Sequence, residues 1–226
     1  MKRPLRNGVA AIISIAAQPA LAQDDFQRWL TLSAQVDATD TIAIQNELVT
    51  RFSDDRGGLY ELENSLLLGY KLSETVTAWA GYVHNPQYDA GDFTIMEHRA
   101  REQVTIDKFA KLATASLSGR IRLEQRWRDG IDGTAWRVRP YLKLGVPLGG
   151  KNAPGLNLTA ETFINLNTTS FQDVNGLERL RSAGLLTFPV SEAVRIEAGY
   201  LNQHRFVRGA PDTDDHVLTA SLALSF

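Results

Sequence analysis

The sequence lacks cysteine, which excludes disulfide bonds, zinc–thiolate sites and thiol catalysis. After residue 22 it also lacks any run of about 18 apolar residues, the length that a transmembrane helix requires. No apolar pattern of helical period occurs in that part of the chain. These absences argue against a disulfide-stabilised scaffold, a helical membrane protein and a helical bundle.

Basic charge is scarce as well. The first 22 residues hold three basic residues and no acidic one, which leaves 21 basic residues against 26 acidic ones and a formal charge of −5 in the rest of the chain. This balance argues against nucleic-acid binding. No glycine-rich phosphate loop, haem motif or nucleotide fingerprint is present, so no cofactor is expected. Acidic turns such as PDTDD lack a complete calcium-loop pattern, and because aspartate commonly forms turns, no metal site is expected either.

The N-terminus has the composition of a secretory signal. The basic residues of MKRPLR precede an apolar stretch at residues 9–17, and Ala-Leu-Ala at residues 20–22 supplies a cleavage site. Signal peptides have this order of charged, apolar and small residues. We therefore expect a signal peptide at residues 1–22 and an exported domain at residues 23–226.

The rest of the chain alternates between apolar and polar residues, which is the period of a strand with two different faces. In the last stretch, for example, Leu218, Leu222 and Leu224 are apolar while Thr219 and Ser221 are polar. Turn clusters rich in glycine, proline and aspartate separate such stretches. Eleven strands are predicted, at residues 26–36, 41–52, 60–72, 76–84, 95–106, 112–127, 136–148, 156–167, 177–188, 194–203 and 216–226.

The predicted fold class is all-β: a transmembrane, antiparallel, up-and-down β-barrel of about 12 strands, within a range of 10–12. The alternative is a soluble sandwich or lipocalin-like barrel, whose apolar face points inward. Strands longer than the usual five or six residues, and connections that alternate between long and short, favour the membrane barrel. Bacterial single-chain barrels have even strand numbers and both ends on the periplasmic side. Eleven strands therefore imply an error of one, near the N-terminus or in residues 107–119, and twelve is the preferred number.

Aromatic residues mark the expected membrane surfaces. Tyr60 and Tyr70 share the apolar parity of one predicted strand, ten residues apart. This spacing is roughly 25 Å once the strand tilts by about 40°, which matches the height of the apolar band of a membrane barrel. The residues predicted to form the membrane girdle are Tyr60, Tyr70, Tyr82, Trp127, Trp136 and Tyr200.

Charged residues occupy the opposite face of the strands. In GRIRLEQRWRDG, Arg122 and Glu124 alternate with Ile121 and Leu123. Charges in a low-dielectric interior must pair or meet water, and a barrel lumen allows both. The predicted lumen charge ladder is Glu47, Arg51, Glu61, Glu63, Glu97, Arg99, Arg101, Arg120, Arg122, Glu124, Arg126, Arg137, Arg139, Lys143, Glu161, Arg179, Arg181, Arg195 and Glu197. Basic residues exceed acidic ones roughly two to one in this set, so an open lumen would favour anions. An ion-paired filling that closes the lumen is the alternative.

Several segments resemble an uncharacterised Gram-negative family, domain of unknown function 2490. They are GRIRLEQRWRDG and RVRPYLKLGVPLGG, with EHRAREQ before them and GYLNQH after them. The resemblance covers about residues 24–226. It implies a barrel in the outer membrane of a Gram-negative bacterium, with an arginine-rich pair of central strands and a terminal aromatic residue, Phe226, that the barrel-assembly machinery reads as an assembly signal. The expected partners are that machinery, outer-membrane lipid and lipopolysaccharide, and the oligomeric state stays open. The family brings no activity and no catalytic residues, and Pro140 departs from good strand chemistry, which predicts a bulge or local loss of pairing.

Three functions stay open. The first is a narrow or plugged pore with an Arg/Glu-lined lumen that passively favours anions. The second is an outer-membrane enzyme acting on lipid or lipopolysaccharide, which would need a nucleophile, a histidine and an acid near the outer rim. His84, His204 and His216 fall near that rim, with Ser170, Asp214 and Asp215 in adjacent loops, but no catalytic residue is assigned. The third is a structural or accessory barrel in envelope assembly or surface-polymer export.

Overall fold

The computed structural model describes residues 24–150 and 152–226. Within these residues no helix is long and apolar enough to cross a membrane. The signal peptide expected at residues 1–22 lies outside the described residues. The strands are β1 (Asp25–Asp37), β2 (Ile42–Ser53), β3 (Gly58–Lys71), β4 (Val76–Asp89), β5 (Asp92–Leu112), β6 (Ala115–Arg128), β7 (Ile131–Pro147), β8 (Gly155–Asn165), β9 (Gly176–Pro189), β10 (Val194–Arg205) and β11 (Thr213–Ser225).

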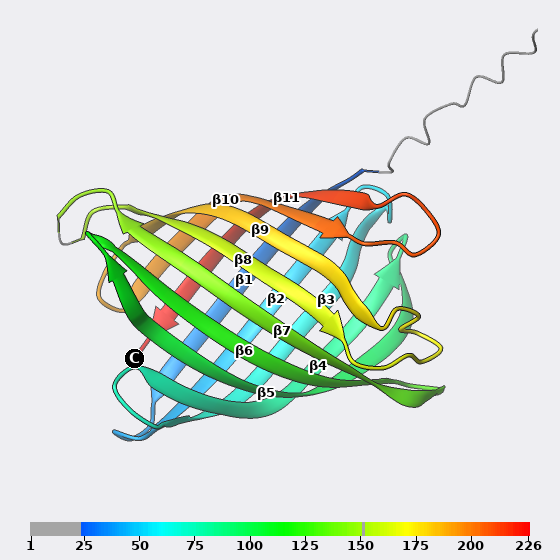
Figure 1. The fold of residues 1–226 in the computed structure, drawn as a ribbon, viewed down its shortest axis with the longest axis horizontal. Helices are drawn as coiled ribbons and strands as arrows, with labels where there is room; N and C mark the ends of the chain where they lie inside the picture. The colour runs from blue at the N-terminus through cyan, green and yellow to red at the C-terminus, as the bar shows by residue number, and fades with distance from the viewer. Residues whose placement is uncertain (1–23, 151) are drawn as a thin grey trace, which may run out of the picture.

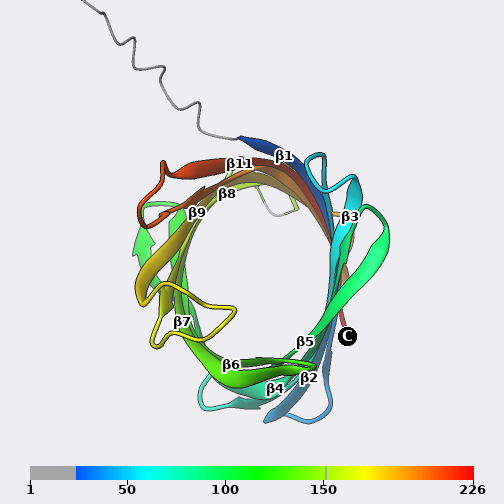
Figure 2. The same ribbon diagram turned by 90° about the vertical axis from the view of Figure 1, so that its right-hand side faces the viewer.

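These eleven strands form a closed barrel (Figures 1 and 2). Each strand pairs with the next one along the chain in antiparallel orientation, and β1 closes the ring against β11. The all-β barrel class is confirmed, and the strand number lies within the expected range of 10–12. It differs by one from the preferred number of twelve.

The seam between β1 and β11 accounts for the odd number. These two strands run parallel, in register from Asp25 opposite Asp215 to Gln35 opposite Ser225. A ring of antiparallel pairs needs an even number of strands, but one parallel pair closes a ring of eleven. The segment suspected of hiding a strand, residues 107–119, instead belongs to β5 and β6, and the pairing register between them shifts near Ile106 and Ala110. The sheet is therefore mixed rather than wholly antiparallel.

Because β1 and β11 run parallel, the start of β1 and the end of β11 lie at opposite rims of the barrel. β1 begins at one rim, called here the N-terminal rim, and β11 ends at the other, called here the C-terminal rim (Figure 1). The expectation that both ends lie on one side is therefore wrong. The longest loop, 166–175, lies at the N-terminal rim together with 206–212, whereas 148–154, which is as long as 206–212, lies at the C-terminal rim. The long connection expected after residue 84 is instead mostly strand, because β4 and β5 continue to a two-residue turn at Ala90 and Gly91, both with positive φ.

The alternation of side chains sets the two surfaces of the barrel. On β3, Leu67 is 2% exposed, while its neighbours Leu66 and Leu68 are 55% and 56% exposed. On β6, Ile121 is exposed while Arg122 is buried. The apolar face points outward and the charged face inward, which is the reverse of the arrangement in a soluble barrel.

Tyr60 corrects one of the predicted positions. It was expected in the outer girdle, but it is 9% exposed and its hydroxyl donates a hydrogen bond to Oε1 of Gln27 inside the barrel, at 2.8 Å. The cause is a register shift between β2 and β3, where Arg51 pairs with Glu61 and Phe52 pairs with Leu59. Tyr60 is the extra residue of this β-bulge, so it points inward beside Glu61 instead of alternating with it.

Candidate functional site

The interior of the barrel carries the charge ladder. Eleven of its predicted members are buried, namely Arg51, Glu63, Glu97, Arg99, Arg101, Arg122, Glu124, Arg126, Arg137, Arg139 and Glu161. Glu47, Glu61, Arg120, Lys143, Arg179, Arg181 and Glu197 are half-buried, and Arg195 is exposed at a hollow of the C-terminal rim. Trp29, Trp79 and Phe163, which share the inward parity, are buried among them.

Three glutamates each form ion pairs with three arginines. Glu124 on β6 lies 2.8 Å from Arg101, 2.5 Å from Arg137 and 3.1 Å from Arg139. The other two carboxylates contact the following partners: Glu63 with Arg51, Arg99 and Arg101, and Glu97 with Arg99, Arg126 and Arg128. Burial of a charge is costly unless it is paired and hydrogen-bonded. Sharing each carboxylate among several arginines meets this requirement and links β2, β3, β5, β6 and β7 across the lumen.

Arg101 and Glu124 lie between two chambers of the lumen, because Arg99 and Arg126 line one chamber and Gln103 and Arg122 line the other. Their side chains are each 0% exposed and form an ion pair of 2.8 Å. On one side lies the N-terminal chamber, of about 140 Å³, lined by residues that include Arg51, Arg99 and Arg126. On the other side lies the C-terminal chamber, of about 350 Å³. We call the Arg101–Glu124 pair the septum.

The N-terminal chamber is strongly basic. Ten arginines and two glutamates, Glu61 and Glu63, line it. It shares Arg56, Tyr60 and Arg205 with a hollow of about 240 Å³ at the N-terminal rim. The chamber therefore adjoins that hollow, which is the side from which water and small solutes would approach it.

The C-terminal chamber has a different lining. Gln35, Gln45, Thr77 and Gln103 supply neutral polar groups. Lys143, Arg120, Arg122, Glu47 and Asp107 supply charges, and Trp79 and Leu67 are apolar. The chamber shares Arg195 with a further hollow at the C-terminal rim. Each half of the lumen is thus open toward its own rim.

Sequence reasoning missed several interior residues because the predicted strands were too short. Arg128, Arg205 and Asp215 have the inward parity of Arg126 and Gln203, but they fell in segments interpreted as turns. Arg128 pairs with Glu97 at 2.8 Å, and Arg205 pairs with Asp215 at 2.8 Å. Continuing the period of two into the flanking turns would have identified them.

The other girdle residues lie on the outer surface. Tyr70, Tyr82, Trp127, Trp136 and Tyr200 are exposed. The ring of His98 stacks against Tyr82 and Trp127, with centroids 5.9 and 5.8 Å apart. Nδ1 of His98 hydrogen-bonds with the hydroxyl of Tyr82, and Nε2 contacts Asp129 at 3.0 Å.

The histidines do not assemble with a serine. His204 contacts Asp212 and Asp214, and His216 hydrogen-bonds with the hydroxyl of Tyr200. Across residues 24–150 and 152–226, no hydrogen bond joins Ser170 to a histidine. The described part of the chain therefore brings histidines and acids together near the N-terminal rim without the nucleophile that acyl transfer requires.

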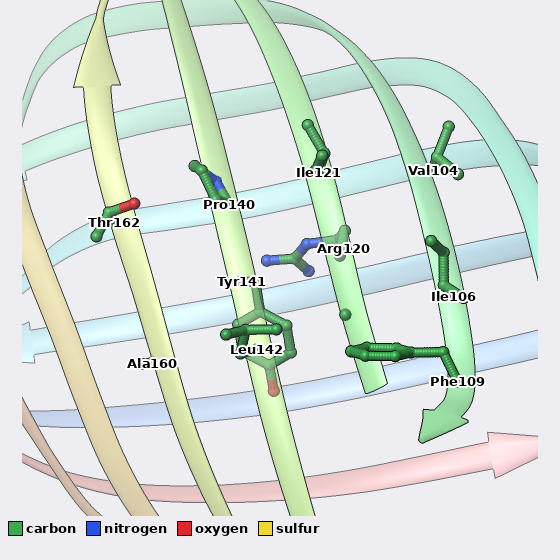
Figure 3. Close-up of a pocket in the computed structure, with 11 residues that line it drawn as sticks. Val104, Ile106, Phe109, Arg120, Ile121, Pro140, Tyr141, Leu142, Ala160 and Thr162 are labelled. Atoms are coloured by element: carbon green, nitrogen blue, oxygen red, sulfur yellow. The ribbon is translucent and has the colours of Figure 1, made fainter. Parts of the chain in front are cut away.

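A hollow of about 430 Å³ opens on the outer wall across β5 to β8 (Figure 3). Val104, Phe109, Ile121 and Leu142 form its apolar walls. It lies beside Pro140, which pairs with Ile121 on β6 but has no partner in the register with β8. The predicted local loss of pairing thus occurs on one side only, because proline has no amide to donate. The hollow is continuous with the apolar outer surface, and few of the residues that line it carry polar groups.

Comparisons with known proteins give a family but no activity. An uncharacterised protein of Methylorubrum extorquens is 26% identical to this chain over 231 residues, covering 99% of this chain and 98% of its own length. No solved structure matches the chain. The family described as protein of unknown function, DUF2490, matches residues 26–214. The resemblance seen in the arginine-rich segments is thereby confirmed, and the chain belongs to the DUF2490 family.

Proposed function

We propose that the protein is an outer-membrane β-barrel that forms a narrow, anion-preferring pore, held closed by the septum of Arg101 and Glu124. The observation that carries this proposal is the position of a pair of side chains that water does not reach, between two chambers that are each open toward their own rim. In this proposal, loss of the pair joins the chambers into a path through the barrel.

The outer surface supports a membrane location. Exposed leucines on β3 and exposed aromatic residues such as Tyr70 and Trp136 cover the wall that would meet lipid. Closed barrels with an apolar exterior and a polar interior are the β-structures that span membranes. Outer-membrane lipid and lipopolysaccharide are the proposed surroundings, and the barrel-assembly machinery is the proposed partner during insertion. Phe226, exposed at the C-terminal rim and hydrogen-bonded through its amide to the carbonyl of Gln35, is the proposed assembly signal.

The preference for anions rests on the charge of the interior. Arginines far outnumber carboxylates along the N-terminal chamber. Rings of basic side chains favour anions in pores through their summed field. In the septum itself, Arg101 also contacts Glu63 at 2.7 Å. Its guanidinium therefore forms ion pairs with two carboxylates, so a single substitution of Arg101 removes both pairs.

Single-channel conductance in a planar bilayer tests the proposal. The protein is first shown to be folded by a heat-dependent gel shift. The wild type is expected to show no steady current. Arg101→Ser should conduct steadily, with a reversal potential in a salt gradient that favours anions, because Glu124 keeps Arg137 and Arg139 as partners while the septum is lost.

Arg195→Ser is the matched control, since it removes the same charge from an exposed position away from the septum. It should behave as the wild type does. A folded Arg101→Ser barrel that stays silent, or that prefers cations, contradicts the pore. Steady current through the wild type contradicts the closed septum.

A further inference from the structure

Arg181 on β9 is an interior arginine without a carboxylate partner among the described residues. It lines the N-terminal chamber. Its Nε donates a hydrogen bond to Oε1 of Gln203 at 2.8 Å, and its guanidinium lies 4.5 Å from the ring centroids of both Trp29 and Phe163. The aromatic rings and Gln203 fix the plane of this guanidinium, and its two terminal nitrogens make no hydrogen bond within the described part of the chain.

The surroundings of Arg181 are crowded with positive charge. The guanidinium groups of Arg137, Arg139, Arg179 and Arg181 all lie over the ring of Phe163, at 4.9, 4.2, 5.2 and 4.5 Å. The first three have carboxylates of their own: Glu124 for Arg137, Glu124 and Glu161 for Arg139, and Glu178 for Arg179. Like charges gathered around one ring repel each other in a protein interior unless opposite charges lie among them. Arg181 is the member of this cluster that lacks one.

Two arginines that line the same chamber also have unpaired hydrogen-bond donors. The Nε atoms of Arg51 and Arg139 are buried and have no hydrogen-bond partner. A buried donor left unpaired costs free energy, and each such group in a native structure calls for a partner. Guanidinium groups only donate, so the missing partner is an acceptor.

The size and shape of the chamber restrict that acceptor. A volume of about 140 Å³ holds a few water molecules or one small ion. Arg51, Arg139 and Arg181 come from β2, β7 and β9, so they approach the chamber from different sides of the barrel. A tetrahedral oxyanion presents acceptors in all directions, whereas a carboxylate presents them in one plane. Arginine forks fit the edges of such an anion in bidentate fashion.

We propose that the N-terminal chamber is a binding site for one tetrahedral oxyanion of the phosphate or sulfate class, held by Arg181 with Arg51 and Arg139 beside it. The anion supplies the negative charge that the cluster around Phe163 lacks. It enters from the N-terminal rim through the hollow that shares Arg56 and Arg205 with the chamber. This goes beyond the proposed pore, because binding needs access from one rim only and no passage across the septum.

Equilibrium dialysis of the folded protein in detergent against radiolabelled inorganic phosphate tests the site. The wild type should bind one phosphate per barrel in a saturable manner, and sulfate, but not an equal ionic strength of chloride, should compete. Arg181→Gln should weaken binding about tenfold or more, since it removes a charge-assisted bidentate contact. Arg195→Gln, the same charge change on the other side of the septum, should bind as the wild type does.

A second readout keeps the test decisive. Trp29 stacks against Arg181, so its fluorescence should change as phosphate saturates the chamber. If Arg181→Gln does not fold, Arg181→Lys keeps the charge without the planar fork and should bind several-fold more weakly. Absence of saturable binding by the folded wild type, or equal binding by the wild type and the Arg181 variants, overturns the site. The dialysis measures no current, so its result is independent of the bilayer experiment. A folded Arg101→Ser barrel that stays silent refutes the pore and leaves the phosphate site intact, whereas an Arg101→Ser barrel that conducts while the wild type binds no phosphate refutes the site and leaves the pore intact.

Discussion

The Cα atom of Leu185 on β9 lies 2.9 Å from the position that a Cβ atom would take on Gly199 of β10. The carbonyl oxygen of Gly184 lies still closer to that position. These are backbone atoms of the paired strand and cannot swing aside. Gly199→Ala should therefore lower the free energy of unfolding by about 1–3 kcal/mol, the usual cost of overpacking.

Gly184→Ala is the matched control for this prediction. A Cβ atom there would meet only Cδ2 of Leu158, at 3.8 Å, which is ordinary contact. Urea unfolding followed by heat-dependent gel mobility measures both variants. Equal stability of the two would show that β9 and β10 are further apart than described.

Glu124→Gln should destabilise the barrel strongly. The substitution leaves Arg101, Arg137 and Arg139 around an uncharged amide in a part of the lumen that water does not reach. Breaking a buried ion pair by removing one partner costs about 3–5 kcal/mol. Urea unfolding should show this loss, while Glu74→Gln, in an exposed turn, should change stability by less than about 0.5 kcal/mol. A tolerated Glu124→Gln would mean that solvent or another anion compensates these arginines.

The parallel seam can be tested with a disulfide. The protein has no cysteine of its own, so Thr31→Cys and Ser221→Cys together place two thiols on directly paired, inward-facing positions of β1 and β11. Oxidation should join them, because neighbouring strands bring Cα atoms within disulfide range. Unreduced gels and mass spectrometry would detect the bond.

Thr31→Cys with Ser225→Cys is the control pair. Ser225 lies four residues further along the same face of β11, about 13 Å away at 3.3 Å per residue. No bond should form there. Cross-linking of the control pair in preference to the first would refute the register of the seam.

The four tryptophans should report the two surfaces of the barrel. Variants that keep a single tryptophan, with phenylalanine at the other three positions, are reconstituted in vesicles whose lipids are brominated near the headgroup. Trp127 and Trp136 are exposed on the outside and should be quenched, whereas Trp29 and Trp79 are buried in the lumen and should not. Quenching of Trp29, or none of Trp127, would contradict an outward apolar surface in contact with lipid.

The sequence alone predicts the strands and their faces well where pairing is regular. Arg122 and Glu124 point inward and Ile121 points outward, as a period of two requires. Tyr60 breaks the rule because the bulge that turns it inward depends on the pairing of β3 with β2. The direction of the closing strand pair escapes sequence reasoning for a related reason, since periodicity assigns a residue to a face and not to a neighbour.

The partners within the charge ladder are also beyond the reach of the sequence. Glu63 and Arg101 are separated by 38 residues and come from strands that are not adjacent, yet they meet at 2.7 Å inside the barrel. Which interior arginines stay without a carboxylate, Arg122 and Arg181 among them, depends on such cross-lumen contacts. Counting charges predicts a basic interior, but only the three-dimensional arrangement singles out Arg181.

The odd number of strands gives the molecule a fixed sidedness. Because β1 and β11 run in the same direction, Asp25 and Ser225 lie at opposite rims. In a membrane, a label attached near Asp25 would be reached from one compartment and a label near Ser225 from the other. Paired impermeant reagents could then establish the orientation of the barrel, because one of the two ends would be reached from each compartment.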